Sequence, residues 1–326
     1  ELLTDEEYET ANRSIQYAHY TSETIVRSMW DMARRFGFKG GTVFEPGMGT
    51  GNFAGMMPGD IAEQSRYQGI EFDHLTSRIA HHLYPKWGVT QADYTRVPAV
   101  KDVYDLVIGN PPFSETVINA DPEYAGKGFM LHDYFFAKSL DAVRPGGLLM
   151  FITSAGTMNK ISTKARDYLA DRADLVGAIR LPGNAFEENA GTSVTTDIVM
   201  LRKRLPGEAI GDRAWTETVE RTLPTRDGTM TTGNVSRYFS ENPEMVLGEE
   251  GMFDKLVAGV RYAVRAPKGY ELGKGLREAM NRLPAMVMSE PETGTDRAKA
   301  DFDLTTTERK DGSFYIGEDG RLMQMR

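Results

Sequence analysis

Short apolar runs alternate with helix-type segments through residues 41–204, and this alternation constrains the fold more than any other feature of the sequence. Strands that alternate with helices build mostly parallel sheets with helices on both faces. Strands are expected over residues 42–44, 67–71, 89–93, 104–109, 148–153, 175–181 and 195–202. We therefore predict an α/β fold with a doubly wound, mostly parallel, seven-stranded sheet.

The segments around these strands complete the predicted organisation. Helices are expected within residues 4–36, 53–64, 73–84, 132–143, 164–171, 252–265 and 272–282. Residues 284–312 are predicted to be a mobile linker, followed by a terminal hairpin that turns at Asp319-Gly320. The predicted parts are an N-terminal helical segment, a central α/β domain and a C-terminal α+β appendage, over residues 1–40, 41–204 and 205–326.

The composition excludes several classes of protein. The 326 residues contain no cysteine, which excludes disulfides and thiolate metal sites, and none of the five histidines has a metal-binding spacing. No apolar run approaches the roughly 18 residues of a membrane span, and no signal-peptide pattern opens the chain. We expect a cytoplasmic protein without a metal. The net charge of -9 argues against strong binding of nucleic acid by this chain alone, although an acidic body can carry a basic cleft.

Both ends of the sequence favour the interpretation that the chain is a piece of a larger polypeptide. The chain begins at Glu1 without a methionine. It ends on residues 320–326, which read as a strand cut off within a domain. A trimmed form of a complete protein would show the same ends, so both interpretations stay open.

A glycine-rich turn directly follows the first predicted strand. Its glycines are Gly47, Gly49 and Gly51, and Asn52 stands where a dinucleotide-binding turn would carry its third glycine. Glycines at the carboxyl end of a strand let a ligand approach the backbone closely. The turn indicates a nucleotide-like ligand, although a purely structural turn would also use these glycines.

Acidic residues end the second and third predicted strands. Glu71 lies about 20 residues beyond the glycines, where a carboxylate can accept hydrogen bonds from ribose hydroxyls. Asp93 can accept a hydrogen bond from an adenine amine. An exposed strand-end position is the alternative for Glu71 alone. Three strand ends with suitable groups together predict a ligand site at one edge of the sheet.

The segment Asn110-Pro111-Pro112-Phe113 follows the fourth predicted strand. Both prolines fix φ and lack an N–H donor, so the segment is extended and presents carbonyl groups. The Asn110 side-chain oxygen and the Pro111 carbonyl can accept both hydrogens of a planar exocyclic amine, which turns the nitrogen lone pair toward an electrophilic methyl group. Phe113 offers a face on which a base can stack. A proline-rich turn is the alternative for this segment in isolation.

With these motifs in the gamma order, residues 15–204 resemble the amino-methyltransferases that act on adenine in DNA. The resemblance implies a Rossmann-like class I methyltransferase fold that uses S-adenosylmethionine to methylate the N6 amine of an adenine flipped out of DNA. It implies that the cofactor is bound by His19, Tyr20, Thr21, Glu45, Pro46, Gly47, Gly49, Gly51, Asn52, Phe53, Glu71, Phe72, Asp93, Tyr94 and Asn110. The implied catalytic residues are Asn110, Pro111, Pro112 and Phe113, and the implied base-stacking residues are Phe113 and Phe186. An ordinary core position is the alternative for Phe186.

A narrower resemblance covers residues 238–248. This segment is similar to part of the large phage- and plasmid-borne polypeptides that fuse such a methyltransferase to a superfamily-two helicase. The resemblance implies a restriction-modification or antirestriction context. It also implies a helicase region as a partner that supplies affinity for DNA.

Other functions stay open from the residues alone. The same tetrapeptide serves enzymes that methylate a glutamine amide in release factors, and related enzymes modify RNA. A non-catalytic module that binds the cofactor or DNA within an assembly is an alternative of another class. The presence of both Asn110 and Phe113 argues against such a module.

Overall fold

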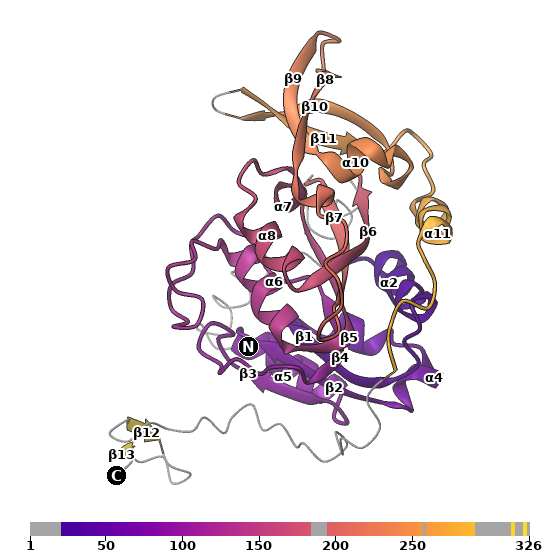
Figure 1. The fold of residues 1–326 in the computed structure, drawn as a ribbon. Coiled ribbons are helices and arrows are strands. Elements are labelled where there is room, and N and C mark those ends of the chain that lie inside the picture. The colour runs from indigo at the N-terminus through magenta and orange to yellow at the C-terminus, as the bar shows by residue number, and fades with distance from the viewer. Residues whose placement is uncertain (1–20, 184–193, 257–258, 291–313, 317–321, 325–326) are drawn as a thin grey trace, which may run out of the picture.

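The computed structural model describes residues 21–183, 194–256, 259–290, 314–316 and 322–324 (Figure 1). Its centre is a seven-stranded sheet with the strand order β3-β2-β1-β4-β5-β7-β6. The strands are β1 (Gly41–Pro46), β2 (Ser65–Glu71), β3 (Gly88–Gln91), β4 (Tyr104–Gly109), β5 (Val143–Ser154), β6 (Ala173–Leu181) and β7 (Thr196–Lys203). β7 runs antiparallel between β5 and β6, whereas the other pairs are parallel. The predicted mostly parallel, seven-stranded sheet is confirmed.

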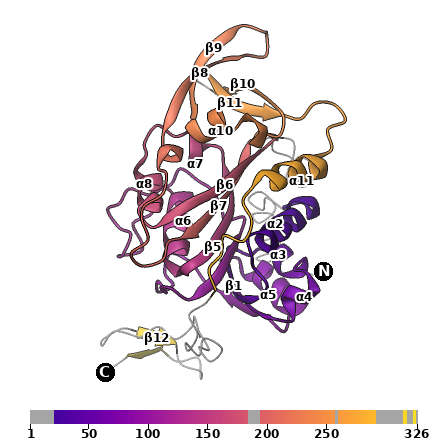
Figure 2. The ribbon, with the colours of Figure 1, turned by 45° about the vertical axis from the view of Figure 1, so that its right-hand side comes forward.

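Helices cover both faces of this sheet, as a doubly wound fold requires. α6 (Leu131–Ala142) and α8 (Lys164–Ala170) lie on one face, and α2 (Glu23–Arg35) and α11 (Leu272–Arg282) pack together on the other (Figures 1 and 2). The shorter helices are α3 (Asn52–Gly55), α4 (Gly59–Ala62), α5 (His74–Leu83), α7 (Gly156–Asn159) and α10 (Arg237–Glu241), with 3-10 turns at Ala214–Thr216 and Pro243–Met245. α6 is buried around most of its circumference, so its polar side chains need partners inside the protein.

Parallel pairing brings the carboxyl ends of β1, β2 and β4 to one edge of the sheet. Glu45 lies opposite Gly69 in this pairing, two residues before Glu71. All six residues of β4 are buried, and Asn110 directly follows this strand. Residues from several strands therefore meet where a ligand can contact them together.

The helix predicted over residues 53–64 is interrupted in the structure. α3 and α4 are separate, and Pro58 stands at the N-cap of α4. Proline has no N–H to donate to a preceding turn, so a continuous helix would lose a hydrogen bond at this position.

The helix predicted over residues 252–265 is wrong. This segment belongs to an antiparallel hairpin of β10 (Glu249–Leu256) and β11 (Gly259–Arg265). Met252, Tyr262 and Val264 are buried in a small second core with residues of β8 (Thr218–Pro224) and β9 (Met230–Ser236). Tyr262 and Val264 are two residues apart and share a face, which is the period of a strand.

The predicted linker over residues 284–312 is wrong for the part that the structure describes. The Met286 N–H donates to the Arg35 carbonyl at 2.9 Å, and the Met288 N–H donates to the Phe36 carbonyl at 2.9 Å. The Ser289 carbonyl accepts a hydrogen bond from the guanidinium of buried Arg144 at 2.9 Å. Residues 284–290 therefore dock onto the sheet domain, and residues 291–312 lie outside the described residues.

The ends of the chain are described only in part. The terminal hairpin is confirmed by the antiparallel pairing of β12 (Phe314–Ile316) with β13 (Leu322–Gln324), and its turn at Asp319-Gly320 lies outside the described residues. Of the helix predicted over residues 4–36, the described part is α2. Among the helices that the structure describes, none is long and apolar enough to cross a membrane.

Candidate active site

A cavity of about 870 Å³ opens at the carboxyl ends of β1, β2 and β4. Most of the residues predicted to form a site line it together. They are Thr21, Glu45, Gly47, Gly49, Asn52, Phe53, Glu71, Phe72, Asp93, Tyr94, Asn110, Pro111 and Pro112. The cavity therefore contains residues from each of the sequence motifs that predicted a ligand site.

The glycine turn brings the end of β1 against the proline segment. A Cβ atom added to Gly47 would lie 3.2 Å from Pro112 Cδ, so a larger residue there would push the two segments apart. Gly49 has a φ of 57°, a backbone conformation that residues other than glycine rarely adopt. The N–H groups of Gly47 and Met48 both donate to the Ile70 carbonyl, at 2.8 and 2.9 Å, which ties the turn to β2.

Glu71 joins the glycine turn to the start of α5. Its Oε2 accepts a hydrogen bond from the Gly49 N–H at 2.8 Å, and its Oε1 accepts one from the Asp73 N–H at 2.8 Å. Burial raises the pKa of Glu71, and these amide hydrogen bonds offset part of that rise. Each carboxylate oxygen has a second lone pair, so the carboxylate can still accept from ligand hydroxyls.

Glu45 is a buried carboxyl group in the cavity wall. It is 2% exposed, and it accepts a short hydrogen bond from the hydroxyl of Tyr67, which is also buried. Burial raises the pKa of Glu45 well above its ordinary value; the Tyr67 hydrogen bond opposes the rise, and the charge of Glu71 adds to it. A positive group in the cavity would favour the ionised form of Glu45.

Asp93 follows β3 and is turned by its own local hydrogen bonds. Its Oδ1 accepts from the Thr95 N–H at 2.9 Å and from the Thr95 hydroxyl at 2.7 Å. Its Oδ2 lies 3.4 Å from the Arg96 guanidinium. The carboxylate thus has a fixed orientation at the cavity, as a residue that reads a ligand group requires.

Asn110 is connected to the segment that precedes α2. Its amide nitrogen donates to the Thr21 hydroxyl at 3.1 Å, and the Asn52 amide nitrogen lies 3.5 Å from the Thr21 carbonyl. With its nitrogen engaged by Thr21, the Asn110 amide is held in one rotation. Thr21 is therefore in contact with both the glycine turn and the proline segment.

His132, in the first turn of α6, lies behind the proline segment. It is 6% exposed and hydrogen bonds to the backbone of Ser114, the residue after Phe113. Burial lowers the pKa of His132, and the charge of Asp133 offsets part of that effect. Burial of this side chain thus favours its neutral form.

Some predicted residues lie elsewhere. Pro46, Gly51 and Phe113 do not line the cavity, and Phe113 is half-buried. His19, Tyr20 and Phe186 lie outside the described residues. The roles predicted for these residues stay predictions.

Other lining residues were not predicted from the sequence. They are Met48, Thr50, Ile70, Asp73, His74, Thr76, Gln91, Ala92, Thr95, Ile118, Leu131 and Phe135. Leu131 and Phe135 lie four positions apart on α6, so they share a helix face. That spacing was visible in the sequence, but nothing in it showed that the face points to the cavity rather than to the core.

The charge of the cavity is one-sided. Glu45, Glu71, Asp73 and Asp93 line it, and its described lining contains no Lys or Arg. Within the described part of the chain, no group of three or more His, Asp or Glu residues is arranged to hold a metal ion. The arrangement suits an organic ligand that carries positive charge.

Comparison with known proteins gives this geometry a family context. Residues 61–185 match the model of the Eco57I restriction-modification methylase family. This segment of the chain is therefore similar to restriction-modification methylases. It is 31% identical to the Defense against restriction protein B of Escherichia phage P1 over 191 residues, which are 57% of this chain and 8% of the phage protein. The chain thus spans less than a tenth of the length of that curated relative.

Solved structures share the fold. A Listeria monocytogenes protein described as a class I S-adenosylmethionine-dependent methyltransferase superposes with a TM-score of 0.50 at 19% identity, over 59% of this chain and 63% of that one. A methyltransferase subunit of a type I restriction-modification system from Streptococcus thermophilus gives 0.51 at 14% identity, over 87% and 62%. The predicted Rossmann-like class I methyltransferase fold is confirmed.

Proposed function

We propose that this chain transfers a methyl group from S-adenosylmethionine to the N6 amine of adenine in DNA. The observation that carries the proposal is a cavity with four carboxyl groups and no Lys or Arg in its described lining, which also contains Asn110, Pro111 and Pro112. Such a cavity favours a cationic adenosine derivative over a dinucleotide, because the pyrophosphate of a dinucleotide is negative.

The residues present fit this cofactor. Glu71 would accept from the ribose hydroxyls, Asp93 from the adenine amine, and the exposed ring of Phe72 offers an apolar face to the adenine ring. A positively charged ligand would favour the ionised form of Glu45, which would then add negative charge near the glycine turn. When bound, S-adenosylmethionine supplies a methyl group on a positively charged sulfur.

Asn110 and Pro111 are proposed to hold the amine that accepts the methyl group. The Asn110 amide oxygen and the Pro111 carbonyl accept the two N–H hydrogens of a flat amine, so that its lone pair faces the methyl group. Thr21 holds the Asn110 amide by the 3.1 Å hydrogen bond. Positioning of this kind can supply most of the rate of a transfer that needs no covalent attachment to the protein.

The proposed acceptor is an adenine flipped out of duplex DNA. The match of residues 61–185 to a restriction-modification methylase family and the similarity to a phage protein of defence against restriction support DNA as the substrate. Phe113 and Phe186 remain the proposed stacking residues. Because the net charge is -9, we also propose that a helicase region or another subunit contributes affinity for DNA.

The proposal is tested by labelled methyl transfer. The chain is incubated with methyl-labelled S-adenosylmethionine and with unmethylated duplex DNA, RNA or a release factor. We expect label in DNA, incorporated about 10²–10³-fold more slowly with Asn110→Ala. Label in RNA or in the release factor, but not in DNA, would show another acceptor, and cofactor binding without transfer to any of them would indicate a binding module.

A further inference from the structure

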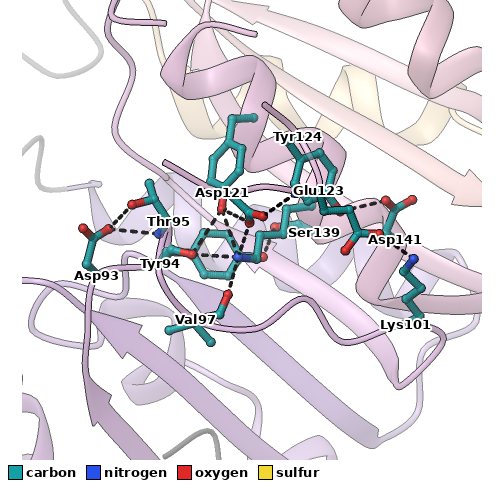
Figure 3. Close-up of polar contacts among 12 residues, drawn as sticks. Asp93, Tyr94, Thr95, Val97, Lys101, Asp121, Glu123, Tyr124, Ser139 and Asp141 are labelled. Carbon is teal, nitrogen blue, oxygen red and sulfur yellow. Dashed lines mark hydrogen bonds and ion pairs between the residues drawn. The ribbon is translucent and has the colours of Figure 1, made fainter. Parts of the chain in front are cut away.

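α6 carries a buried lysine that the proposed chemistry does not use. Lys138 is 2% exposed, and its Nζ lies 2.8 Å from the Tyr94 carbonyl, 2.6 Å from the Val97 carbonyl, 2.8 Å from Asp121 Oδ2 and 2.9 Å from the Tyr134 hydroxyl. Figure 3 labels Tyr94, Val97 and Asp121 among these partners. An ammonium group has three protons, so these four oxygens engage all of them. A buried charge is unfavourable without partners, so the partners show what the lysine holds in place.

Tyr134 is on α6 itself, and the other three partners belong to two segments that wall the cavity. Tyr94 is in the segment after β3, and it lines the cavity beside Asp93. Asp121 is in the segment between the proline tetrapeptide and α6, which contributes Ile118 to the cavity. In the proposed function the first segment faces the cofactor and the second follows the residues that hold the acceptor. Lys138 donates hydrogen bonds to both segments.

The charges and rings around Lys138 strengthen this connection. Burial alone would raise the pKa of Asp121, but hydrogen bonds from Lys138 and Tyr134 and the lysine charge hold that pKa below its ordinary value. The Lys138 ammonium lies 4.8 Å from the ring centroid of Tyr94 and 5.5 Å from that of Tyr134. The Tyr94 ring also packs against the ring of Phe135, and both residues line the cavity.

We propose that Lys138 is a positioning residue that couples the two sides of the cavity. In this account, a ligand held at Asp93 and Tyr94 orders the segment of Asp121 and Ile118 through the lysine, and with it the acceptor side. The coupling rests on the proposed function, since it assigns the cofactor to the Asp93 side.

Lys203 offers a matched control. Its Nζ donates to three carbonyl oxygens, at 3.0, 2.9 and 2.8 Å, and pairs with Asp102 at 2.9 Å. These carbonyls belong to the C-terminal end of α6 and the start of β5, and Lys203 does not line the cavity. Lys203→Met therefore removes comparable hydrogen bonds from the same helix without touching the two cavity segments.

The experiment compares hydrogen exchange and calorimetric binding of S-adenosylmethionine in the full chain and both variants. With Lys138→Met we expect faster exchange in residues 94–97 and 116–124, about tenfold weaker cofactor binding, and loss of the protection that the cofactor gives to residues 116–124. With Lys203→Met we expect none of these three changes. Should Lys138→Met fail to fold, Asp121→Asn is measured instead, and faster exchange in residues 116–124 with weaker cofactor-induced protection is expected.

The coupling would be overturned if Lys138→Met left both hydrogen exchange and cofactor affinity unchanged. If Lys138→Met does not fold, the same result with Asp121→Asn would overturn it. The same loosening in Lys203→Met would overturn it too, because the effect would then report general destabilisation. A wild-type chain that binds no S-adenosylmethionine would overturn the proposed function instead. The exchange rates without ligand would still decide whether Lys138 ties the two segments together.

Discussion

The two halves of the sheet hold buried charge in opposite ways. At the ends of β1 and β2, Glu45 and Glu71 face the cavity, and among the residues that the structure describes no Lys or Arg lines that space. On β6 and β7, Arg180 and Asp197 are fully buried and form two hydrogen bonds of 2.7 Å with each other. The first half leaves negative charge for a ligand, whereas the second half neutralises its charges internally.

The C-terminal region completes the second half. The ring of Phe239 lies 4.1 Å from the Arg180 guanidinium and that of Tyr262 lies 4.8 Å from it. The Leu247 N–H donates to the Arg180 carbonyl at 2.8 Å. A paired and covered charge of this kind serves the fold, and an unneutralised carboxyl group in a cavity is a candidate for function.

Arg180→Met should give the largest change in stability and none in binding. The substitution leaves Asp197 buried without its partner, so we expect the free energy of unfolding to fall by about 3–5 kcal/mol. Denaturant unfolding measures this loss, and calorimetry at a temperature where the variant is folded should give a wild-type affinity for S-adenosylmethionine. If Arg180→Met instead kept wild-type stability but lost much of its affinity for S-adenosylmethionine, then β6 and β7 would serve ligand binding, and the two halves of the sheet would not differ as described.

Asn110→Ala should have the largest effect on turnover. The variant loses the proposed acceptor of an amine hydrogen, so we expect methyl transfer to fall by about 10²–10³-fold while cofactor affinity changes little. Single-turnover rates with saturating cofactor measure this effect. Near-normal turnover would show that Asn110 does not orient the acceptor.

Glu71→Gln should weaken cofactor binding by about ten- to a hundred-fold, because it removes the negative charge and one of the acceptor oxygens that receive backbone N–H groups. Glu208→Gln is the control, since Glu208 pairs with Arg202 at the surface at 3.0 Å and does not line the cavity. Calorimetric titration of both variants gives the comparison. Equal affinities would contradict the proposed ribose contact.

The pH dependence of binding should show the smallest effect. The pKa of Glu45 is raised by burial, so a cationic ligand binds more tightly as pH rises through that pKa and the carboxyl loses its proton. The sign is opposite for the unliganded protein: the folded chain holds this proton more tightly than the unfolded chain, so Glu45 makes stability fall over the same rise in pH. Tyr67→Phe removes the hydrogen bond that opposes the shift and should move the binding profile to higher pH; an unmoved profile would exclude Glu45 as its source.

The site was predictable where it depends on the ends of strands. Glu45, Glu71 and Asn110 each follow or end an apolar run, and parallel strands place such ends at one edge. That reasoning needs only local patterns and a topology rule. It located Glu71, Asn110 and several neighbouring residues of the cavity, whereas Thr21, Phe53, Phe72 and Tyr94 were implied only by the family resemblance.

Features that depend on packing across the chain could not be predicted in this way. Phe135 and Lys138 lie on a helix that is buried on most sides, so its sequence does not show which face meets the cavity. The hairpin of β10 and β11 was mistaken for a helix because its burial is set by contacts with Leu223 and Val235, more than 15 residues away in sequence. Pairing of that kind leaves only a weak local pattern.

The most direct test of the central claim is mass spectrometry of nucleosides from unmethylated duplex DNA treated with the full chain and S-adenosylmethionine. We predict N6-methyladenosine in its deoxy form, which forms about 10²–10³-fold more slowly with Asn110→Ala and at the wild-type rate with Glu208→Gln. Methyl groups found on cytosine, or no methylated nucleoside although the chain binds the cofactor, would contradict the account.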